Sequence, residues 1–492
     1  MGNSKLFFAK VLNFNFSEKE LISLLIVSQI IIYLILPDYL TNNQITITGS
    51  DAPSYIFFNF SNLKEIFSQH RTFGLPLIIK IYQFFSETLY FWPQVNYFIF
   101  CLSNIFLINA LFKSKFNLLF SFFFVIGVVG SHNLYFYLNS WTELYSVSFI
   151  IFSLSFFLLS LNKKKYYLYI LAAFFLFYSY QIRPSFIVYI FFFPTYILLK
   201  NLFLYKKLKL IFKDLIKVVF LSIIPFIVFI IIRFLITDHF GVTPFAGVNI
   251  AGHATHYLEE KDIKSLSKKN KIFAKSLFER KKKHVYPCNL GLDQIKENKL
   301  VSHDIKRKCF NIYVMSGWLE MIKVKKKLEP FPENDYRNFN SWTYVETLGI
   351  FFTESGNNNE VDKELSSFAW ELILKNKNYR EKYSKWFLYS FYESLYLQFY
   401  SLLNLIYLYI VVFFVFVLSK FNRIKKKIVV DHISEIKALI FSIIFVQFLS
   451  LFLTSMTNIP YIRALSTQSV FLVPSLMSFL VFYIFHEKSK NI

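Results

Sequence analysis

The chain has 492 residues, of which 55% are apolar and 17% charged, and it contains 64 Phe, 32 Tyr and 6 Trp. This composition excludes an ordinary soluble protein, and it excludes disorder over most of the length. The net charge of +23 would suit nucleic acid, but most of the basic excess lies in connectors between apolar blocks, without an RNA- or DNA-binding motif. Nucleic acid is therefore not an expected partner.

The three cysteines exclude a disulfide-stapled scaffold and a structural zinc site built on a Cys cluster. Cys101 lies in an apolar block. Cys288 and Cys309 share one polar region, and they can form a single bridge if that region faces an oxidising compartment. The sequence does not decide whether Cys288 and Cys309 form this bridge.

Ten apolar segments are candidate membrane spans, because about 20 mostly apolar residues cross the hydrocarbon core. Their approximate bounds are 21–37, 90–112, 117–131, 142–161, 166–182, 185–204, 218–236, 398–419, 438–455 and 469–485. The sequence therefore predicts an all-α polytopic membrane protein. We expect the first span to be retained, because its start is polar and it has no small-residue cleavage site.

The distribution of Lys and Arg predicts that both termini lie in the cytoplasm. In that orientation the cytoplasmic connectors and ends hold 22 Lys and Arg, whereas the short outer connectors hold only Arg183 and Arg463. We expect a transmembrane module at 1–236 with a first outer segment at 38–89, a mostly helical extracytoplasmic domain at 237–397, and a second transmembrane module at 398–492. The bias towards Phe, Ile, Lys, Asn and Tyr indicates an AT-rich genome, and we expect a bacterial inner membrane.

Two outer stretches are predicted to be helical without spanning the membrane. The stretch 75–85 (LPLIIKIYQFF) is apolar but too short and too interrupted to span, which predicts a helix at the membrane interface. The stretch 363–396 has the mixed aromatic and charged face of one amphipathic helix leading into the eighth span.

The first candidate functional residues lie in the first outer segment. In the motif GSDAPSY, Asp51 can accept a proton from a hydroxyl or bind a metal, and Tyr55 shares its face if a helix starts here. In the motif HRTFGLP, Arg71 follows His70 and can pair with a lipid phosphate. The alternatives are that Asp51 caps a short surface helix and that Arg71 is a basic interfacial anchor.

Three further polar groups face the same side in the predicted topology. They are Trp141-Thr142-Glu143, Arg183-Pro184 and Tyr461-Ile462-Arg463. A lone Arg at a helix end usually snorkels to lipid headgroups, and a lone Glu often caps a helix. Five such groups on one face together predict a polar cavity that opens at the outer leaflet.

The order of these features resembles the GT-C superfamily of integral membrane glycosyltransferases. The motifs that carry the resemblance are GSDAPSY, RTFGLPL, QIRPSF, IPYIRALSTQSVFLVPSL and FAWELILKNKNYREKYSKWFLYSF. The last motif is similar to a helix that precedes the later spans in bacterial members, except that Lys377 and Asn378 stand where that pattern has its proline. The resemblance implies transfer of a sugar from a polyprenyl-phosphate-linked donor to a glycan, lipid or protein acceptor at the extracytoplasmic face.

We assign Asp51 as the general base towards the acceptor hydroxyl. The residues expected to hold the donor phosphate are Arg71, Arg183 and Arg463. The residues expected to bind or orient the substrates are Tyr55, His70, Glu143, His253 and Tyr461. A divalent cation, Mg²⁺ or Mn²⁺, at Asp51 is left open, because several superfamily members carry an acidic pair and this loop has Asp51 alone.

Two other functions compete with this prediction. A polysaccharide polymerase or ligase of the O-antigen type would use outer-loop Arg and His, such as His253 and His256, instead of Asp51. A transporter or flippase would show polar residues or broken helices at the bilayer midplane and an internal repeat. The spans show neither clearly, since Arg233 lies near an end of its span.

Overall fold

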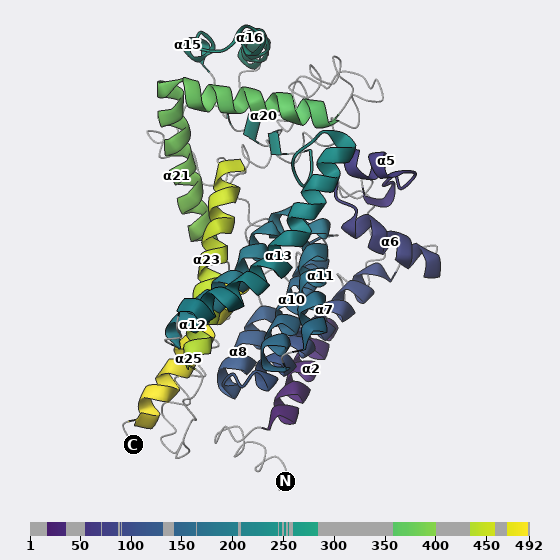
Figure 1. Cartoon of the computed structure of the whole chain (residues 1–492), viewed down its shortest axis with the longest axis vertical. Helices are drawn as coiled ribbons and strands as arrows, with labels where there is room; N and C mark the ends of the chain where they lie inside the picture. The colour runs from purple at the N-terminus through teal and green to yellow at the C-terminus, as the bar shows by residue number, and fades with distance from the viewer. Residues whose placement is uncertain are drawn as a thin grey trace.

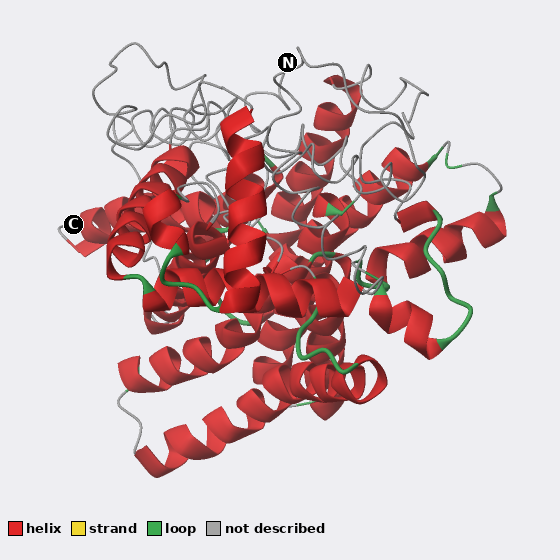
Figure 2. Ribbon diagram, turned by 90° about the horizontal axis from the view of Figure 1, so that it is seen from above, coloured by secondary structure: helices red, strands yellow, loops and turns green. Residues whose placement is uncertain are grey.

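The computed structural model describes residues 17–35, 55–69, 71–86, 89, 91–130, 142–163, 165–204, 208–244, 246–247, 250–251, 254, 259–283, 358–399, 433–457 and 470–490. These residues form helices and loops without any strand (Figure 2). The prediction of an all-α chain is confirmed for this part of the sequence.

The helices follow the apolar blocks of the sequence and the polar segments between them. Within the described residues they are α2 (Glu18–Ile35), α5 (Leu63–Ser68), α6 (Gly74–Phe85), α7 (Trp92–Lys113), α8 (Leu118–Val129), α10 (Glu143–Lys163), α11 (Tyr166–Ile182), the 3₁₀ helix η1 (Pro184–Phe191), α12 (Phe192–Phe203), α13 (Leu208–Thr237), α15 (Glu260–Ile263), α16 (Lys268–Lys283), α20 (Asn358–Lys375), α21 (Lys377–Phe399), α23 (Ile433–Thr457) and α25 (Leu472–Lys490).

Helices form over nine of the ten predicted spans, and residues 400–419 of the remaining one lie outside the described residues. Five segments of the described chain are long and apolar enough to cross a membrane: Trp92–Lys113, Glu143–Lys163, Pro184–Phe203, Leu208–Thr237 and Ile433–Met456. Shorter apolar helices are Gly74–Phe85, Leu118–Val129, Tyr166–Ile182 and Leu472–Tyr483. The apolar helices support a membrane protein, and the count of ten spans stays a prediction.

Helix α10 is the centre of the bundle and packs between α7 and α11. Its serines at 146, 148, 153, 155 and 160 are all buried. Small side chains let neighbouring helix backbones approach closely in an apolar bundle. Ser153 shows this directly, because its hydroxyl donates across to the carbonyl of Ala172 on α11 at 2.6 Å.

One end of the bundle is marked by lysines at the ends of its helices. At this end, here called the lysine end, three helices finish near a lysine: α7 near Lys113, α10 near Lys163 and α12 near Lys200. Lys200 Nζ lies 3.6 Å from the carboxylate of Glu435 at the start of α23. Figure 1 shows the start of α2 and the end of α25 at this end, and α5, α15, α16 and α20 at the other. The membrane orientation of the two ends stays a prediction.

The described part of segment 237–397 has an apolar core of its own. The core is made by α15, α16, α20 and the first turns of α21, with Phe273 against Phe368 at a ring-centroid distance of 4.8 Å. The single amphipathic helix predicted over 363–396 is wrong, because α20 ends at Lys375 and α21 begins at Lys377 (Figure 1). Asn376 causes the break: its Oδ1 accepts from Tyr379 N at 3.1 Å and caps α21, while its Nδ2 donates to Asp262 at 3.1 Å.

A carboxylate on α20 holds α16 against this core. The Glu371 side chain accepts hydrogen bonds from Ser267 N and Oγ, both at 2.8 Å, from Lys375 Nζ at 3.0 Å, and from Asn270 Nδ2. Burial raises the pKa of Glu371, but the hydrogen bonds from Asn270, Lys375 and Ser267 outweigh it and lower the pKa from 4.5 to about 2. The carboxylate is therefore favoured in the folded state.

The contact between α16 and α20 should weaken in acid. Since the folded pKa of Glu371 lies below its unfolded value, its contribution to stability is complete above about pH 4.5 and is lost as the pH falls towards about 2. We expect the urea midpoint, followed by fluorine NMR of 5-fluorotryptophan at Trp370, to fall more between pH 5 and pH 3 in the wild type than in Glu371→Gln. Equal falls in both proteins would contradict this role of Glu371.

Candidate functional site

The end of the bundle opposite the lysine end carries an apolar cluster that joins four segments. Its buried members are Tyr55, Leu75, Ile79, Trp92, Tyr145 and Ile182. Tyr145 lies two residues after Glu143, and Ile182 directly precedes Arg183. The cluster therefore brings the first outer segment next to the start of α10 and the end of α11, which we call the arginine end.

Glu143 and Arg183 form an ion pair at the arginine end. The Arg183 guanidinium contacts the Glu143 carboxylate through Nη1, and the Glu143 side chain is fully buried. The second carboxylate oxygen accepts from the Thr142 hydroxyl at 2.9 Å, and Arg183 Nε donates to Ser185 Oγ at 3.2 Å. Removing one partner of such a buried pair typically costs about 3–5 kcal/mol. The pair therefore fixes the start of α10 to the end of α11.

Gly74 brings the first outer segment onto this pair. A Cβ built on Gly74 would meet the carbonyl carbon and oxygen of Gln181 at 2.5 Å and the nitrogen of Ile182 at 2.7 Å. The start of α6 therefore touches the backbone of the last turn of α11, one residue before Arg183. Only glycine permits this approach, because any side chain would collide with backbone atoms.

Arg71 and Tyr55 also meet within the first outer segment. The Arg71 guanidinium carbon lies 4.7 Å from the centroid of the Tyr55 ring, and Tyr55 is itself a member of the apolar cluster. A guanidinium over an aromatic face gains a cation–π attraction of about 0.5–2 kcal/mol. Arg71 thus contacts the cluster through Tyr55, and the pair of Glu143 and Arg183 adjoins it next to Tyr145 and Ile182.

The other residues expected at the site lie outside the described residues. They are Asp51, His70, His253, Tyr461 and Arg463, and the same holds for His256 and for Cys288 with Cys309. Their roles stay predictions.

Gln181 is a residue of this end that the sequence did not single out. It is fully buried, and neither its amide oxygen nor its amide nitrogen has a hydrogen-bond partner among the described residues. The Tyr145 hydroxyl is in the same situation. An unsatisfied buried polar group costs about 1–3 kcal/mol, so these atoms favour a polar ligand or water at this end.

A second polar cluster lies further out, around Arg233 near the end of α13. Arg233 is buried and donates to the carbonyls of Phe67 at 3.0 Å and Gly241 at 2.8 Å. Beside it, His239 Nε2 lies 2.9 Å from Asp362 Oδ2 on α20. The sequence showed Arg233 as a charge inside an apolar helix, which is a general indication of function, but its partners are mostly backbone carbonyls that no motif reveals.

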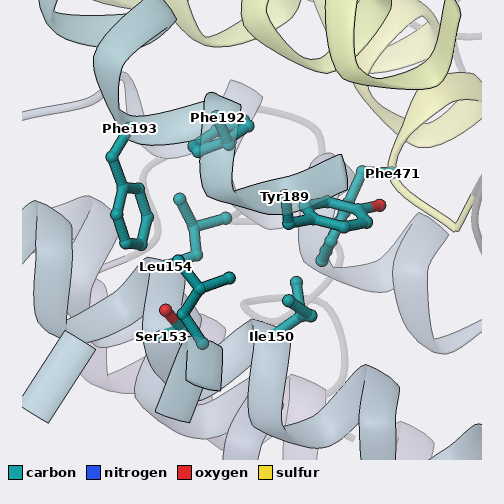
Figure 3. A pocket seen from close by; sticks show the side chains of 8 residues that line it. Ile150, Ser153, Leu154, Tyr189, Phe192, Phe193 and Phe471 are labelled. Carbon is teal, nitrogen blue, oxygen red and sulfur yellow. The ribbon is translucent and has the colours of Figure 1, made fainter. Parts of the chain in front are cut away.

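The cleft shown in Figure 3 does not carry polar chemistry. It lies between α10, α11, η1, α12 and the start of α25 and has room for only about 10 Å³, and apart from Ser153 and Tyr189 its lining is apolar. The Ser153 hydroxyl already donates to Ala172. The polar groups of the arginine end are not part of its lining.

Within the described residues, no group of three or more His, Cys, Asp or Glu is arranged to hold a metal ion. Comparison with protein-family models, with curated proteins and with solved structures found no match for this chain. The functional argument therefore rests on the side chains and their chemistry.

Gly74 should not tolerate a side chain. Gly74→Ala forces α6 away from α11, and we expect it to lower the free energy of unfolding by about 1–3 kcal/mol. Gly130→Ala is the control, because the nearest atom to its Cβ is the Ile126 carbonyl oxygen at 3.3 Å and its φ of −83° suits alanine. Unfolding in detergent by SDS, followed by tryptophan fluorescence, measures both. Equal stability of the two variants would contradict the close approach.

Gln181 should be replaceable by leucine with a gain in stability. Gln181→Leu removes two buried amide atoms without partners, so the same unfolding measurement should show a gain of about 1 kcal/mol or more. Gln447→Leu on α23 is the control, since of its two amide atoms only the nitrogen is both buried and without a partner among the described residues, and we expect it to be close to neutral. A loss of stability in Gln181→Leu would show that its amide is already satisfied.

Proposed function

We propose that the chain is a membrane glycosyltransferase. It moves a sugar from a polyprenyl-phosphate-linked donor to a glycan, lipid or protein acceptor at the extracytoplasmic face of a bacterial inner membrane. The fold would be GT-C-like. The proposal combines the resemblance of the motifs with the arrangement of the arginine end.

The observation that carries the proposal is the gathering of Tyr55, Arg71, Glu143 and Arg183 over one apolar cluster at one end of an apolar helix bundle. A donor with a lipid chain, a phosphate and a sugar needs cations at the depth of the lipid headgroups and polar groups beside them. The buried amide of Gln181 adds polar atoms that a sugar hydroxyl can satisfy.

The four residues do not contribute equally in this proposal. Glu143 already neutralises Arg183, so we assign Arg183 a structural role, which is to fix the start of α10 to the end of α11. Arg71, whose guanidinium lies on the Tyr55 ring, is the residue that we expect to contact the donor phosphate. Arg463 would add a second cation from the outer connector before the last span.

The proposed reaction needs one base. The acceptor hydroxyl oxygen attacks the anomeric carbon, its proton passes to Asp51, and the bond from the anomeric carbon to the phosphate oxygen breaks. The polyprenyl phosphate leaves as a stable anion and needs no proton donor, unlike the leaving group of a glycosidase. A divalent cation at Asp51 would help to neutralise the phosphate.

Substitutions at Asp51 and Arg71 test the proposal. In membranes supplied with a labelled polyprenyl-phosphate-linked sugar pool, Asp51→Asn should lower sugar transfer by about 100-fold or more, because it removes the base. Arg71→Gln should raise the KM for the donor more than it changes the KM for the acceptor. Lys275→Gln on the exposed face of α16 is the control and should transfer normally.

The protein level in the membrane must be equal in all variants. Retained transfer in Asp51→Asn would exclude the proposed mechanism. A loss confined to His253 and His256 variants would favour the polymerase of the O-antigen type.

A further inference from the structure

Arg233 is buried where three separate segments meet. Its side chain is 1% exposed, and it donates through Nε to the Phe67 carbonyl, through Nη1 to the Gly241 carbonyl and through Nη2 to Asn359 Oδ1 at 3.4 Å. Phe67 belongs to α5 in the first outer segment, and Asn359 belongs to α20 in the outer domain. One guanidinium therefore links both to the end of α13.

Burying this charge is expensive, so the arrangement around it must compensate. A guanidinium has five N–H donors in a rigid plane, which suits several acceptors on different segments better than an ammonium does. The nearby carboxylate of Asp362 is held in place by His239 Nε2 and by Gly247 N at 2.8 Å. The cluster thus fastens the start of α20 to the loop that follows α13.

The segment that bears Arg71 is held at both of its ends. At Phe67 its backbone is bound by Arg233, and at Gly74 it is pressed against Gln181. The Phe67 and Phe73 rings also pack against Phe229, one helical turn before Arg233, at centroid distances of 5.7 and 6.4 Å. The described residues 68–69 and 71–73 therefore lie between two fixed contacts while Arg233 is in place.

We propose that Arg233 is a positioning residue that couples the outer domain to the segment carrying Arg71. A displacement of α20 at Asn359 loosens Arg233, and Arg233 then releases the Phe67 carbonyl and with it the stretch that carries Arg71 and Thr72. The coupling follows from the contacts alone. Its consequence for catalysis rests on the proposed function, in which Arg71 contacts the donor phosphate.

The rate at which a buried thiol in this segment reacts with a water-soluble maleimide measures the coupling. Thr72 is 6% exposed, and Thr72→Cys introduces the thiol into the full chain in detergent, with Cys288→Ser and Cys309→Ser also made. Cys101 on α7 is kept as an internal reference for general loosening of the bundle. The measured quantity is the ratio of the two labelling rates.

Arg233→Gln should raise this ratio by about tenfold or more, because hydrogen bonds from a charged donor are lost. Asn359→Ala, a change on the outer domain alone, should raise it about threefold or more. Glu364→Ala is the matched control on the same helix, because Glu364 pairs with Lys269 of α16 at 2.8 Å and not with Arg233. It should leave the ratio unchanged.

An unchanged ratio in Arg233→Gln or in Asn359→Ala overturns the proposal, and so does an equal rise in Glu364→Ala. Sugar transfer separates this outcome from a failure of the proposed function. If Asn359→Ala raises the labelling ratio and also the KM for the donor, both stand. If the labelling ratio rises but sugar transfer by Asn359→Ala is unchanged, the coupling is supported and the proposed role of Arg71 is rejected. The same conclusion holds if the ratio rises and no protein, the wild type included, transfers sugar.

Discussion

The arginine end depends on the contact between Gly74 and the last turn of α11. Because glycine has no Cβ, the backbone at the start of α6 lies directly on the Gln181 carbonyl. This contact sets the position of Leu75 and Ile79 in the apolar cluster, and it fixes the chain three residues after Arg71 to the last turn of α11. A polar loop outside the apolar bundle thereby acquires a fixed place on it.

Two buried charges near this contact are compensated in different ways. Glu143 is fully buried and is paired with the opposite charge of Arg183, so the pair is neutral as a whole. Arg233 is bonded to two carbonyls and an amide on three segments, with the Asp362 carboxylate nearby. The neutral pair of Glu143 and Arg183 fixes two neighbouring helix ends. The hydrogen bonds of Arg233 instead link segments that are distant in the sequence. Both are costly in an apolar bundle, and such costs are usually retained for function.

The sequence predicted the helices of the bundle well. In a membrane, a run of about 20 apolar residues can satisfy its own backbone hydrogen bonds only as a helix, unless it pairs into a closed barrel. It also placed Glu143 and Arg183 on one face, through the alternation of basic and neutral connectors. It missed the break at Asn376, where a side-chain cap outweighs an amphipathic pattern that continues across it. It missed the partners of Arg233 because backbone carbonyls of Phe67 and Gly241 have no sequence pattern.

The 3₁₀ helix η1 is the least predictable feature of the bundle, and it explains how Arg183 reaches Glu143. Proline disfavours helical geometry in the residue before it, and Arg183 is extended with φ −139° and ψ 104°. The guanidinium therefore leaves α11 at the point where α10 begins.

The side chains after Pro184 record the change of helix type. Phe186 and Tyr189 stack three residues apart at a centroid distance of 5.5 Å, as side chains do in a 3₁₀ helix, whereas Phe192 and Tyr196 stack four apart at 6.4 Å, as in an α-helix. At rises of about 2.0 and 1.5 Å per residue, η1 and α12 together span about 34 Å instead of the roughly 30 Å of an α-helix of equal length. The 3₁₀ turns of η1 are wound more tightly than α-helical turns but rise further per residue. The segment Pro184–Phe203 therefore begins with Arg183 outside α11 and is still long enough to cross a hydrocarbon core of about 30 Å.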